Sequence, residues 1–130
     1  MTGVLFAGQA VVATPMASAS ASNCPARPAF WDGTVGNYCV IVFGSGLKVD
    51  EVYGTFTNLV RPVCNWNITA EFFDINYKWY RTFSGAVHSG CSRHSSTSVY
   101  PRYTAKNGYM CSTLKDNGNR LTSYCFRIKA

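Results

Sequence analysis

The stretch Tyr109 to Lys129, YMCSTLKDNGNRLTSYCFRIK, decides the fold class because it has the pattern of a β-hairpin. Its two β-prone runs flank Asn117-Gly118, the strongest short hairpin signal, because both central residues of a type I′ turn need a positive φ. Similar short runs recur along the chain between Gly, Asn, Asp and Pro residues, and no segment has a long apolar period of 3.6 residues. The pattern predicts an all-β fold, a small antiparallel β-sandwich or barrel of roughly six to eight strands.

Other runs of the chain also have the composition of strands. Tyr38 to Phe43 is dense in β-branched and aromatic residues, so we expect it to be a central strand. Gly54 is expected to end one strand before the next begins. Pro62 is expected to place the strand that contains it at a sheet edge. The further predicted strands are Leu47 to Tyr53, Thr55 to Val63, Ile68 to Asp74 and Tyr77 to Phe83, the last two pairing as a hairpin.

Cysteine usage predicts a disulfide-stapled domain. An even number of cysteines in a small exported chain is typical of a disulfide framework, although about 15 pairings of six are possible. The spacing favours Cys24 with Cys39 and Cys111 with Cys125, each stabilising the fold by about 3 kcal/mol. The cysteines are Cys24, Cys39, Cys64, Cys91, Cys111 and Cys125.

The hairpin register tests the second pairing. If Asn117-Gly118 is a two-residue loop in a regular ladder, Cys111 faces Tyr124, and Cys125 lies on the other side of the sheet. Cys111 and Cys125 then cannot bond. Either an odd loop or a β-bulge restores facing cysteines, or each cysteine bonds elsewhere.

The N-terminus has the composition of a secretory signal. Val4 to Pro15 is mostly small and apolar, and Ala17-Ser18-Ala19 or Ala19-Ser20-Ala21 supplies a small-x-small cleavage pattern, although no Lys or Arg precedes the apolar run. The run is too short for a transmembrane span. We therefore expect a signal peptide at residues 1–21 and a single secreted, extracellular β domain at residues 22–130.

Charge is unevenly distributed along the chain. From Arg81 onward the only acidic residue is Asp116. In the part of the chain before Arg81, basic and acidic residues nearly balance. A positive field attracts anionic surfaces. The expected partner is another secreted protein or an anionic cell-envelope component of a target cell, and nucleic acid is not expected.

Both histidines lie in the polar stretch Phe83 to Val99, FSGAVHSGCSRHSSTSV. We expect a solvated display loop pinned by Cys91, in which His88, Arg93 and His94 face a partner. The spacing H-x2-C-x2-H could hold zinc, but a cysteine of an exported protein is expected to be oxidised, so no metal and no cofactor are predicted.

Aromatic residues are dense just before this stretch. In strict alternation Trp79 and Arg81 share one face of a strand and Tyr80 lies on the other, so at least one of Trp79 and Tyr80 points outward. An outward aromatic ring could stack on a sugar or anchor a protein interface. Trp79 and Arg81 therefore complete the predicted set of binding residues.

An enzymatic interpretation is weaker. A small secreted ribonuclease would need a base, a cation and an acid that converge, and Glu71, Arg81 and His88 or His94 have the right chemistry. Any basic domain with a glutamate and a histidine satisfies that requirement. No catalytic residue is therefore predicted.

The segment His88 to Val99, followed by the basic run Lys106 to Lys115, resembles the central part of the lactococcin 972 type bacteriocins. The resemblance is confined to the C-terminal third. It implies an exported β-sandwich directed against competing bacteria. We expect a secreted non-enzymatic binding module, either a bacteriocin-like effector or a subunit of a secreted antibacterial toxin assembly. The alternatives are an inhibitor of a secreted hydrolase, with loop 84–98 filling the active site, and the ribonuclease.

Overall fold

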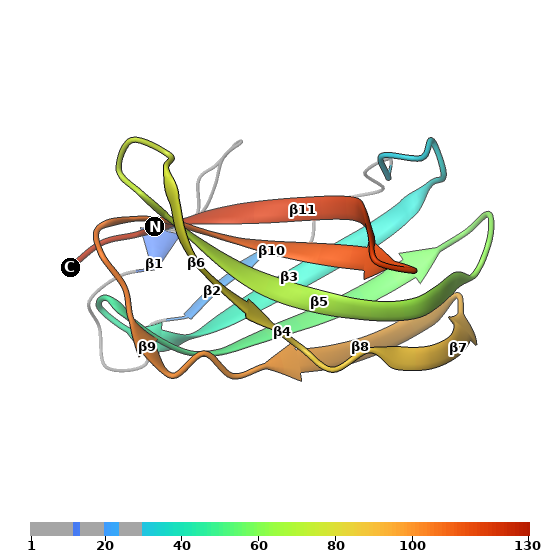
Figure 1. Ribbon diagram of the computed structural model, residues 1–130, viewed down its shortest axis with the longest axis horizontal. Coiled ribbons are helices and arrows are strands. Elements are labelled where there is room, and N and C mark those ends of the chain that lie inside the picture. Colours follow the sequence, from blue (N-terminus) through green and yellow to red (C-terminus); the bar gives the residue numbers. More distant parts are fainter. Residues whose placement is uncertain (1–11, 14–19, 24–29) are drawn as a thin grey trace.

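The computed structural model describes residues 12–13, 20–23 and 30–130, which form a sandwich of two β-sheets without a helix (Figure 1). The first sheet has the order β1-β11-β10-β5-β6, with β7 also pairing with β5, and the second has the order β2-β3-β4-β8, with β9 also pairing with β4. The strands are β1 (Val12–Ala13), β2 (Ser20–Asn23), β3 (Gly36–Ser45), β4 (Lys48–Asn58), β5 (Val63–Asp74), β6 (Trp79–Ser84), β7 (His88–Ser92), β8 (His94–Val99), β9 (Tyr103–Thr104), β10 (Gly108–Asp116) and β11 (Asn119–Ile128).

The predicted all-β sandwich is confirmed, with the core between the two sheets. Alternate residues of each strand point inward, as Val40 does on β3 and Phe72 does on β5, and both are fully buried. Tyr38 and Ser112 join the sheets through a buried hydrogen bond of 2.7 Å between their hydroxyl groups. The strand count exceeds the prediction because several strands are very short and because the polar stretch before Tyr100 is itself folded into strands.

Gly54 does not interrupt the chain as predicted. It lies inside β4, an interior strand, and a Cβ atom there would stand 2.9 Å from the Tyr38 ring and 3.2 Å from Ile68 Cδ1. The glycine therefore makes room for the buried tyrosine ring. The predicted edge strand Thr55 to Val63 is also wrong, because Pro62 lies in the β4–β5 loop and Val63 begins β5.

The β10–β11 hairpin confirms the turn and resolves the disulfide register. Asn117 and Gly118 have φ values of 50° and 80°, as a type I′ turn requires. Lys115 faces Arg120, but the next facing pair skips Leu121, which bulges from the ladder. The bulge brings Cys111 opposite Cys125, and the two form the predicted disulfide.

The stretch Phe83 to Val99 is not the predicted solvated loop. It contains β7, which pairs with the first half of β5, and β8, which pairs with β4 in the other sheet. The chain changes sheets at Arg93, so β7 and β8 form one corner of the sandwich. Polar side chains suit these strands because both lie at sheet edges, where solvent reaches much of each side chain.

Two predictions concern residues that the structure does not describe. The pairing of Cys24 with Cys39 involves Cys24, and most of the signal peptide predicted at residues 1–21 also lies outside the described ranges, so both stay predictions. Within the described residues no cysteine is a free thiol, which indicates an oxidising compartment. The same residues contain no apolar helix of membrane-spanning length.

Candidate functional site

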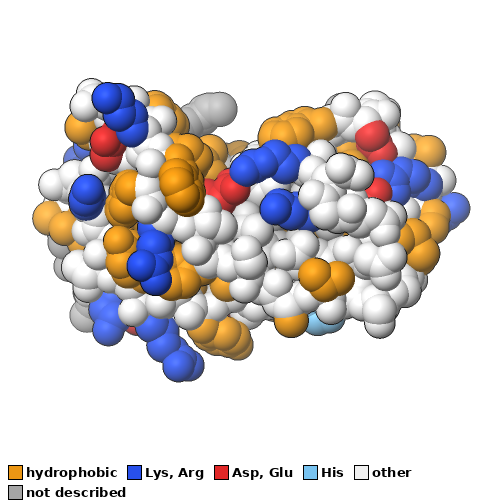
Figure 2. Space-filling view, in the orientation of Figure 1, with side chains coloured by type: hydrophobic (Ala, Val, Ile, Leu, Met, Phe, Trp, Pro, Cys, Tyr) orange, Lys and Arg blue, Asp and Glu red, His pale blue; other side chains and the backbone are white. Residues whose placement is uncertain are grey.

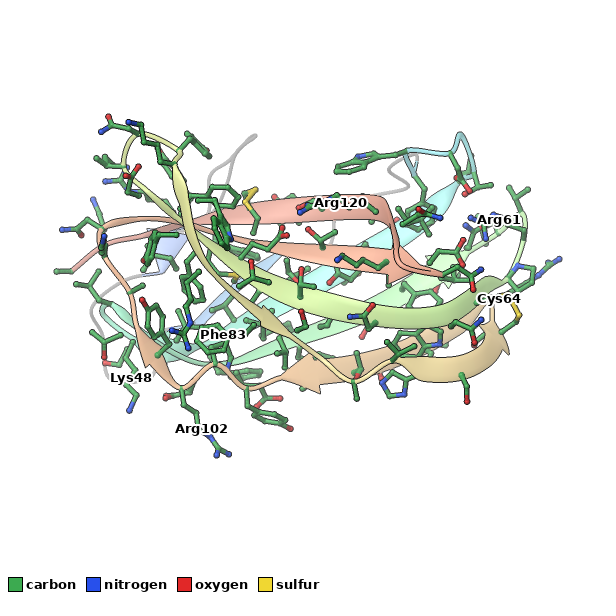
Figure 3. All side chains as sticks on the ribbon, viewed as in Figure 1. Lys48, Arg61, Cys64, Phe83, Arg102 and Arg120 are labelled. Atoms are coloured by element: carbon green, nitrogen blue, oxygen red, sulfur yellow. A yellow bond between two sulfur atoms is a disulfide. The ribbon has the colours of Figure 1, made fainter. Side chains whose placement is uncertain are left out.

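The five residues predicted to face a partner do not form one site. Trp79 and Arg81 belong to β6, whereas His88, Arg93 and His94 belong to the β7–β8 corner. Figure 3 shows the separation, because Phe83 of β6 and Cys64, which is bonded to β7, are labelled in different halves of the molecule. The structure therefore places the five residues in two separate regions, and their role in binding stays a prediction.

The histidines serve the corner itself. The His88 ring stacks on Trp66 with a centroid distance of 4.2 Å, and its Nε2 lies 3.0 Å from the Thr97 hydroxyl. His94 Nδ1 lies 2.6 Å from the Thr57 hydroxyl. Cys91 is bonded to Cys64, so the H-x2-C-x2-H spacing offers no thiolate to a metal. These contacts join β7 and β8 to their neighbours.

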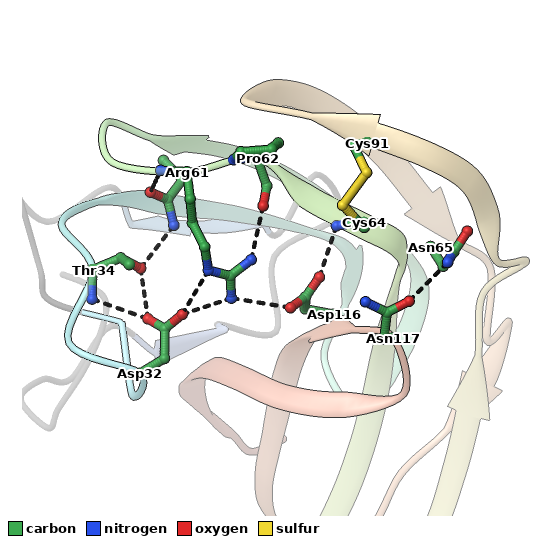
Figure 4. Close-up of polar contacts among 10 residues, drawn as sticks. Asp32, Thr34, Arg61, Pro62, Cys64, Asn65, Cys91, Asp116 and Asn117 are labelled. Atoms are coloured by element: carbon green, nitrogen blue, oxygen red, sulfur yellow. Dashed lines mark hydrogen bonds and ion pairs between the residues drawn. A yellow bond between two sulfur atoms is a disulfide. The ribbon is translucent and has the colours of Figure 1, made fainter.

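A charged clamp holds the loops at the corner end (Figure 4). The Arg61 guanidinium donates to Asp32 at 2.6 and 2.9 Å and to Asp116 at 3.0 Å. The other oxygen of Asp116 accepts the Cys64 backbone N–H. Arg61 thus joins the loop before β3 to the β10–β11 turn, and its positive charge is neutralised by carboxylates within the protein.

Acid should weaken this clamp. Burial raises the pKa of Asp32, but the hydrogen bonds from Thr34 and Arg61 outweigh burial and lower that pKa from 3.8 to about 2. Because the folded-state pKa is the lower one, the stabilisation is complete above about pH 4 and is lost as the pH falls toward 2. We expect Asp32→Asn to reduce the free energy of unfolding by about 1 kcal/mol at pH 7, after allowance for solvent screening, and by much less at pH 2. Urea titrations at both pH values measure the difference. Equal losses at the two pH values would contradict the assignment.

The proposed ribonuclease residues do not converge either. Glu71 faces Thr82 across the β5–β6 ladder, whereas Arg81 faces the core residue Phe72. The Glu71 carboxylate binds Arg120 and the Thr113 hydroxyl. Glu71 and Arg81 thus lie on different sides of the sheet and do not converge.

A different cluster of cations occupies the opposite end of the sandwich, which we call the basic end. Strand register brings these segments together. In the first sheet Gly108 lies opposite both Asp74 and Ile128, and in the second sheet Lys48 lies opposite Thr104. Blue side chains gather at the left of Figure 2, where Figure 3 labels Lys48 and Arg102. The residues of the basic end are Lys48, Lys78, Arg81, Arg102, Lys106, Arg127 and Lys129.

Aromatic rings, not carboxylates, hold four of these cations. Arg81 lies 4.7 Å from the centre of the Phe83 ring, and Lys106 lies 4.6 Å from the centre of the Tyr80 ring. Arg102 and Arg127 lie over Tyr100 and Tyr109 at 5.5 and 5.3 Å. Within the described part of the chain none of the four is in ion-pair distance of a carboxylate. Their positive charge is therefore positioned without being neutralised.

The electrostatic effect of the basic end is visible at Asp74. A backbone hydrogen bond from Lys78 lowers the pKa of Asp74 most, and the charges of Lys78 and Lys106 lower it further. The sequence indicated a positive C-terminal half, and Arg81 was among the predicted residues. It did not indicate that Arg102, Lys106 and Arg127 would meet at one end.

Both histidine-containing strands of the corner, β7 and β8, belong to the segment that resembles the lactococcin 972 type bacteriocins, and this resemblance stays a prediction. Comparison of the chain with protein-family models, with curated proteins and with solved structures found no match.

Proposed function

We propose that the protein is a secreted, non-enzymatic binding module that docks through its basic end on a polyanionic component of a cell envelope. One observation carries the proposal: four cations at this end, Arg81, Arg102, Lys106 and Arg127, lie over aromatic rings and have no carboxylate in ion-pair distance among the described residues. By contrast, Lys48 at the same end pairs with Asp50 at 3.9 Å, and Arg61 and Arg120 elsewhere are also ion-paired.

The arrangement suits a polymer of repeated negative charges. A cation resting on a ring has a restricted position, so less side-chain entropy is lost when an anion binds. Exposed Tyr100 beside Arg102 adds an apolar contact next to a positive charge. Because solvent reaches these groups, we expect binding to weaken as salt screens the charges.

The biological setting is part of the proposal. The disulfides require an oxidising compartment, which the outside of a cell provides. Binding to an envelope polymer suits both a free bacteriocin-like effector and an envelope-targeting subunit of a secreted antibacterial toxin assembly. Elution from a sizing column at the mass of a monomer, when purified from its own host, is expected of the free effector.

A hydrolase inhibitor is less well supported. The predicted loop 84–98 is largely folded into β7 and β8, so it does not project as an inhibitory loop. The β4–β5 loop does expose Leu59 and Val60, but its backbone is occupied, because Asn58 accepts from the N–H groups of Val60 and Arg61. A loop with occupied backbone groups cannot pair as a strand in a protease cleft.

The experiment compares two double variants that remove the same charge. We expect Arg102→Gln with Lys106→Gln to weaken binding to immobilised poly(glycerol phosphate) about 30-fold at low salt, since each cation near an anionic surface contributes about 1 kcal/mol. Arg93→Gln with Ser89→Asp also lowers the net charge by two, but both residues lie in the corner outside the basic end, so this variant should change binding less than about threefold. Surface plasmon resonance across a salt series measures both.

The controls distinguish the site from bulk charge. Equal losses in the two double variants would show that net charge alone binds the polymer, and binding that ignores salt would also contradict the proposal. Tighter binding to RNA than to poly(glycerol phosphate) under the same conditions would replace the envelope partner by nucleic acid.

A further inference from the structure

A depression lies on the outer face of the first sheet, the side that faces away from the core. Its volume is about 390 Å³, and Glu71, Phe73, Trp79, Thr82, Lys115 and Arg120 line it. Figure 2 shows the surface hollowed here, with basic and acidic side chains in the hollow and apolar ones at its margins. The lining residues come from β5, β6, β10 and β11, so the floor is a rigid sheet.

A β-bulge aims Trp79 at this depression. Phe73 faces Trp79 and the adjacent Phe72 faces Arg81, so Tyr80 is the extra residue between them. Strict alternation without a bulge would place Trp79 and Thr82 on opposite faces of the strand, but the bulge places them on the same face. The indole N–H donates to the Thr82 hydroxyl at 2.7 Å. The tryptophan ring is thereby oriented while 60% of the residue stays exposed.

The floor of the depression is polar and pre-organised. Glu71 is only 4% exposed, and its two carboxylate oxygens accept from the two terminal nitrogens of Arg120. Thr113 donates to the same carboxylate and in turn contacts Ser123. Arg120 remains about half exposed, so N–H groups of its guanidinium face solvent for a ligand.

Lys115 gives the depression an excess positive charge. The charges of Glu71 and Arg120 cancel, whereas Lys115 has no ion-pair or hydrogen-bond partner in the described part of the chain. A ligand therefore meets a flat aromatic face at one wall and unpaired positive charge at another.

We propose that this depression binds an acidic saccharide, a sugar that carries a carboxylate or phosphate group. The C–H face of the sugar ring stacks on Trp79, and the anionic group lies between Lys115 and the exposed edge of Arg120. The Thr82 side and the Glu71 floor supply polar partners for ring hydroxyls. This site is separate from the basic end, and the inference does not depend on the proposed docking on a polyanion.

The geometry favours a saccharide over a nucleotide or a peptide. The two aromatic residues of the lining, exposed Trp79 and half-buried Phe73, face each other on neighbouring strands and so share one wall. The opposite wall is charged rather than aromatic, so a base cannot be held between two rings. The volume lies at the small end of the range of about 300–1,000 Å³ that is typical of ligand sites. One or two sugar rings fit this space.

The test uses a galacturonic acid trisaccharide and its neutral galactose counterpart with the full-length protein. We expect the acidic trisaccharide to bind at least about tenfold more tightly than the neutral one in calorimetric titration, because only the former reaches Lys115 and Arg120 with a charge. Trp79→Ala should weaken its binding about tenfold or more, and Lys115→Gln should abolish most of the preference for the acidic sugar.

Trp31→Ala is the matched control, because Trp31 is also 60% exposed but does not line the depression. Its affinity for the acidic trisaccharide should equal that of the unchanged protein. Equal affinity for the two trisaccharides, no binding of either, an unaffected Trp79→Ala variant, or tighter binding of adenosine monophosphate would each overturn the proposal. Polyanion binding through Arg102 and Lys106 would survive all of these outcomes.

Discussion

Replacing Cys64 and Cys91 together by serine is expected to lower the free energy of unfolding by about 3.5 kcal/mol, the chain-entropy value for a separation of 27 residues. Local stability should fall more in the β7–β8 corner than in the rest of the sandwich. None of the residues of β7 is fully buried, so apolar packing holds the strand only weakly and the disulfide is its main attachment to β5. Urea denaturation measures the global loss, and hydrogen exchange of the β7 amides measures the local one.

The second disulfide is the control for that local effect. The disulfide between Cys111 and Cys125 closes a loop with a sequence separation of 14, and replacing both cysteines by serine should lower the free energy of unfolding by about 3 kcal/mol. Their strands remain paired along the ladder and pack Met110 and Phe126 in the core. Exchange at β10 should therefore rise only as much as global stability falls. Equal protection of β7 in both double variants would contradict the role assigned to Cys91.

Arg120→Met is expected to destabilise the protein by about 3 kcal/mol, and Glu71→Gln by only about 1 kcal/mol. The asymmetry follows from burial, since the Glu71 side chain is 5% exposed and the Arg120 side chain is 48% exposed. Loss of the arginine leaves a buried carboxylate with Thr113 as its remaining partner. Loss of the carboxylate leaves an arginine that water can solvate. Chemical denaturation of the two variants at pH 7 tests the difference.

A double variant separates pairing from packing. Arg120→Met combined with Glu71→Leu removes both charges, and most of the lost stability should return, because no buried charge is then left alone. Lys115 is the other cation that lines the depression among the described residues, so it is placed to replace Arg120. If Lys115 replaces Arg120, Arg120→Met alone should lower the free energy of unfolding by less than about 1 kcal/mol. Adding Lys115→Met should then bring the loss back to about 3 kcal/mol.

Local sequence was most informative where a turn has strict backbone requirements. Asn117-Gly118 predicted a type I′ hairpin, and a bulge was one of the alternatives that allow Cys111 and Cys125 to face each other; the structure places that bulge at Leu121. The Tyr38 to Phe43 run was equally informative, because it forms part of β3, an interior strand that pairs with β2 and β4 and buries Tyr38, Val40 and Val42 in the core. Gly54 was misleading, because its space is filled by a tyrosine from the neighbouring strand.

The candidate sites were less predictable. At least one of Trp79 and Tyr80 was expected to point outward, and Trp79 does. Its orientation toward Thr82 depends on a bulge that no residue pattern in the sequence predicted. His88 and His94 were interpreted as display residues, yet each is held by a hydroxyl on a neighbouring strand. The sequence shows every cation of the basic end. It did not predict that Arg102, Lys106 and Arg127, which lie on different segments, come close together.

The sequence by itself determined the all-β class, the hairpin at Asn117-Gly118, the disulfide between Cys111 and Cys125 as one of its alternatives, and the basic character of the C-terminal half. These properties depend on composition or on residues close in the chain. The tertiary structure alone decided that Phe83 to Val99 forms a corner between sheets, and that Glu71 pairs with Arg120. Both depend on strand order and register, which long-range packing selects and which no local pattern encodes.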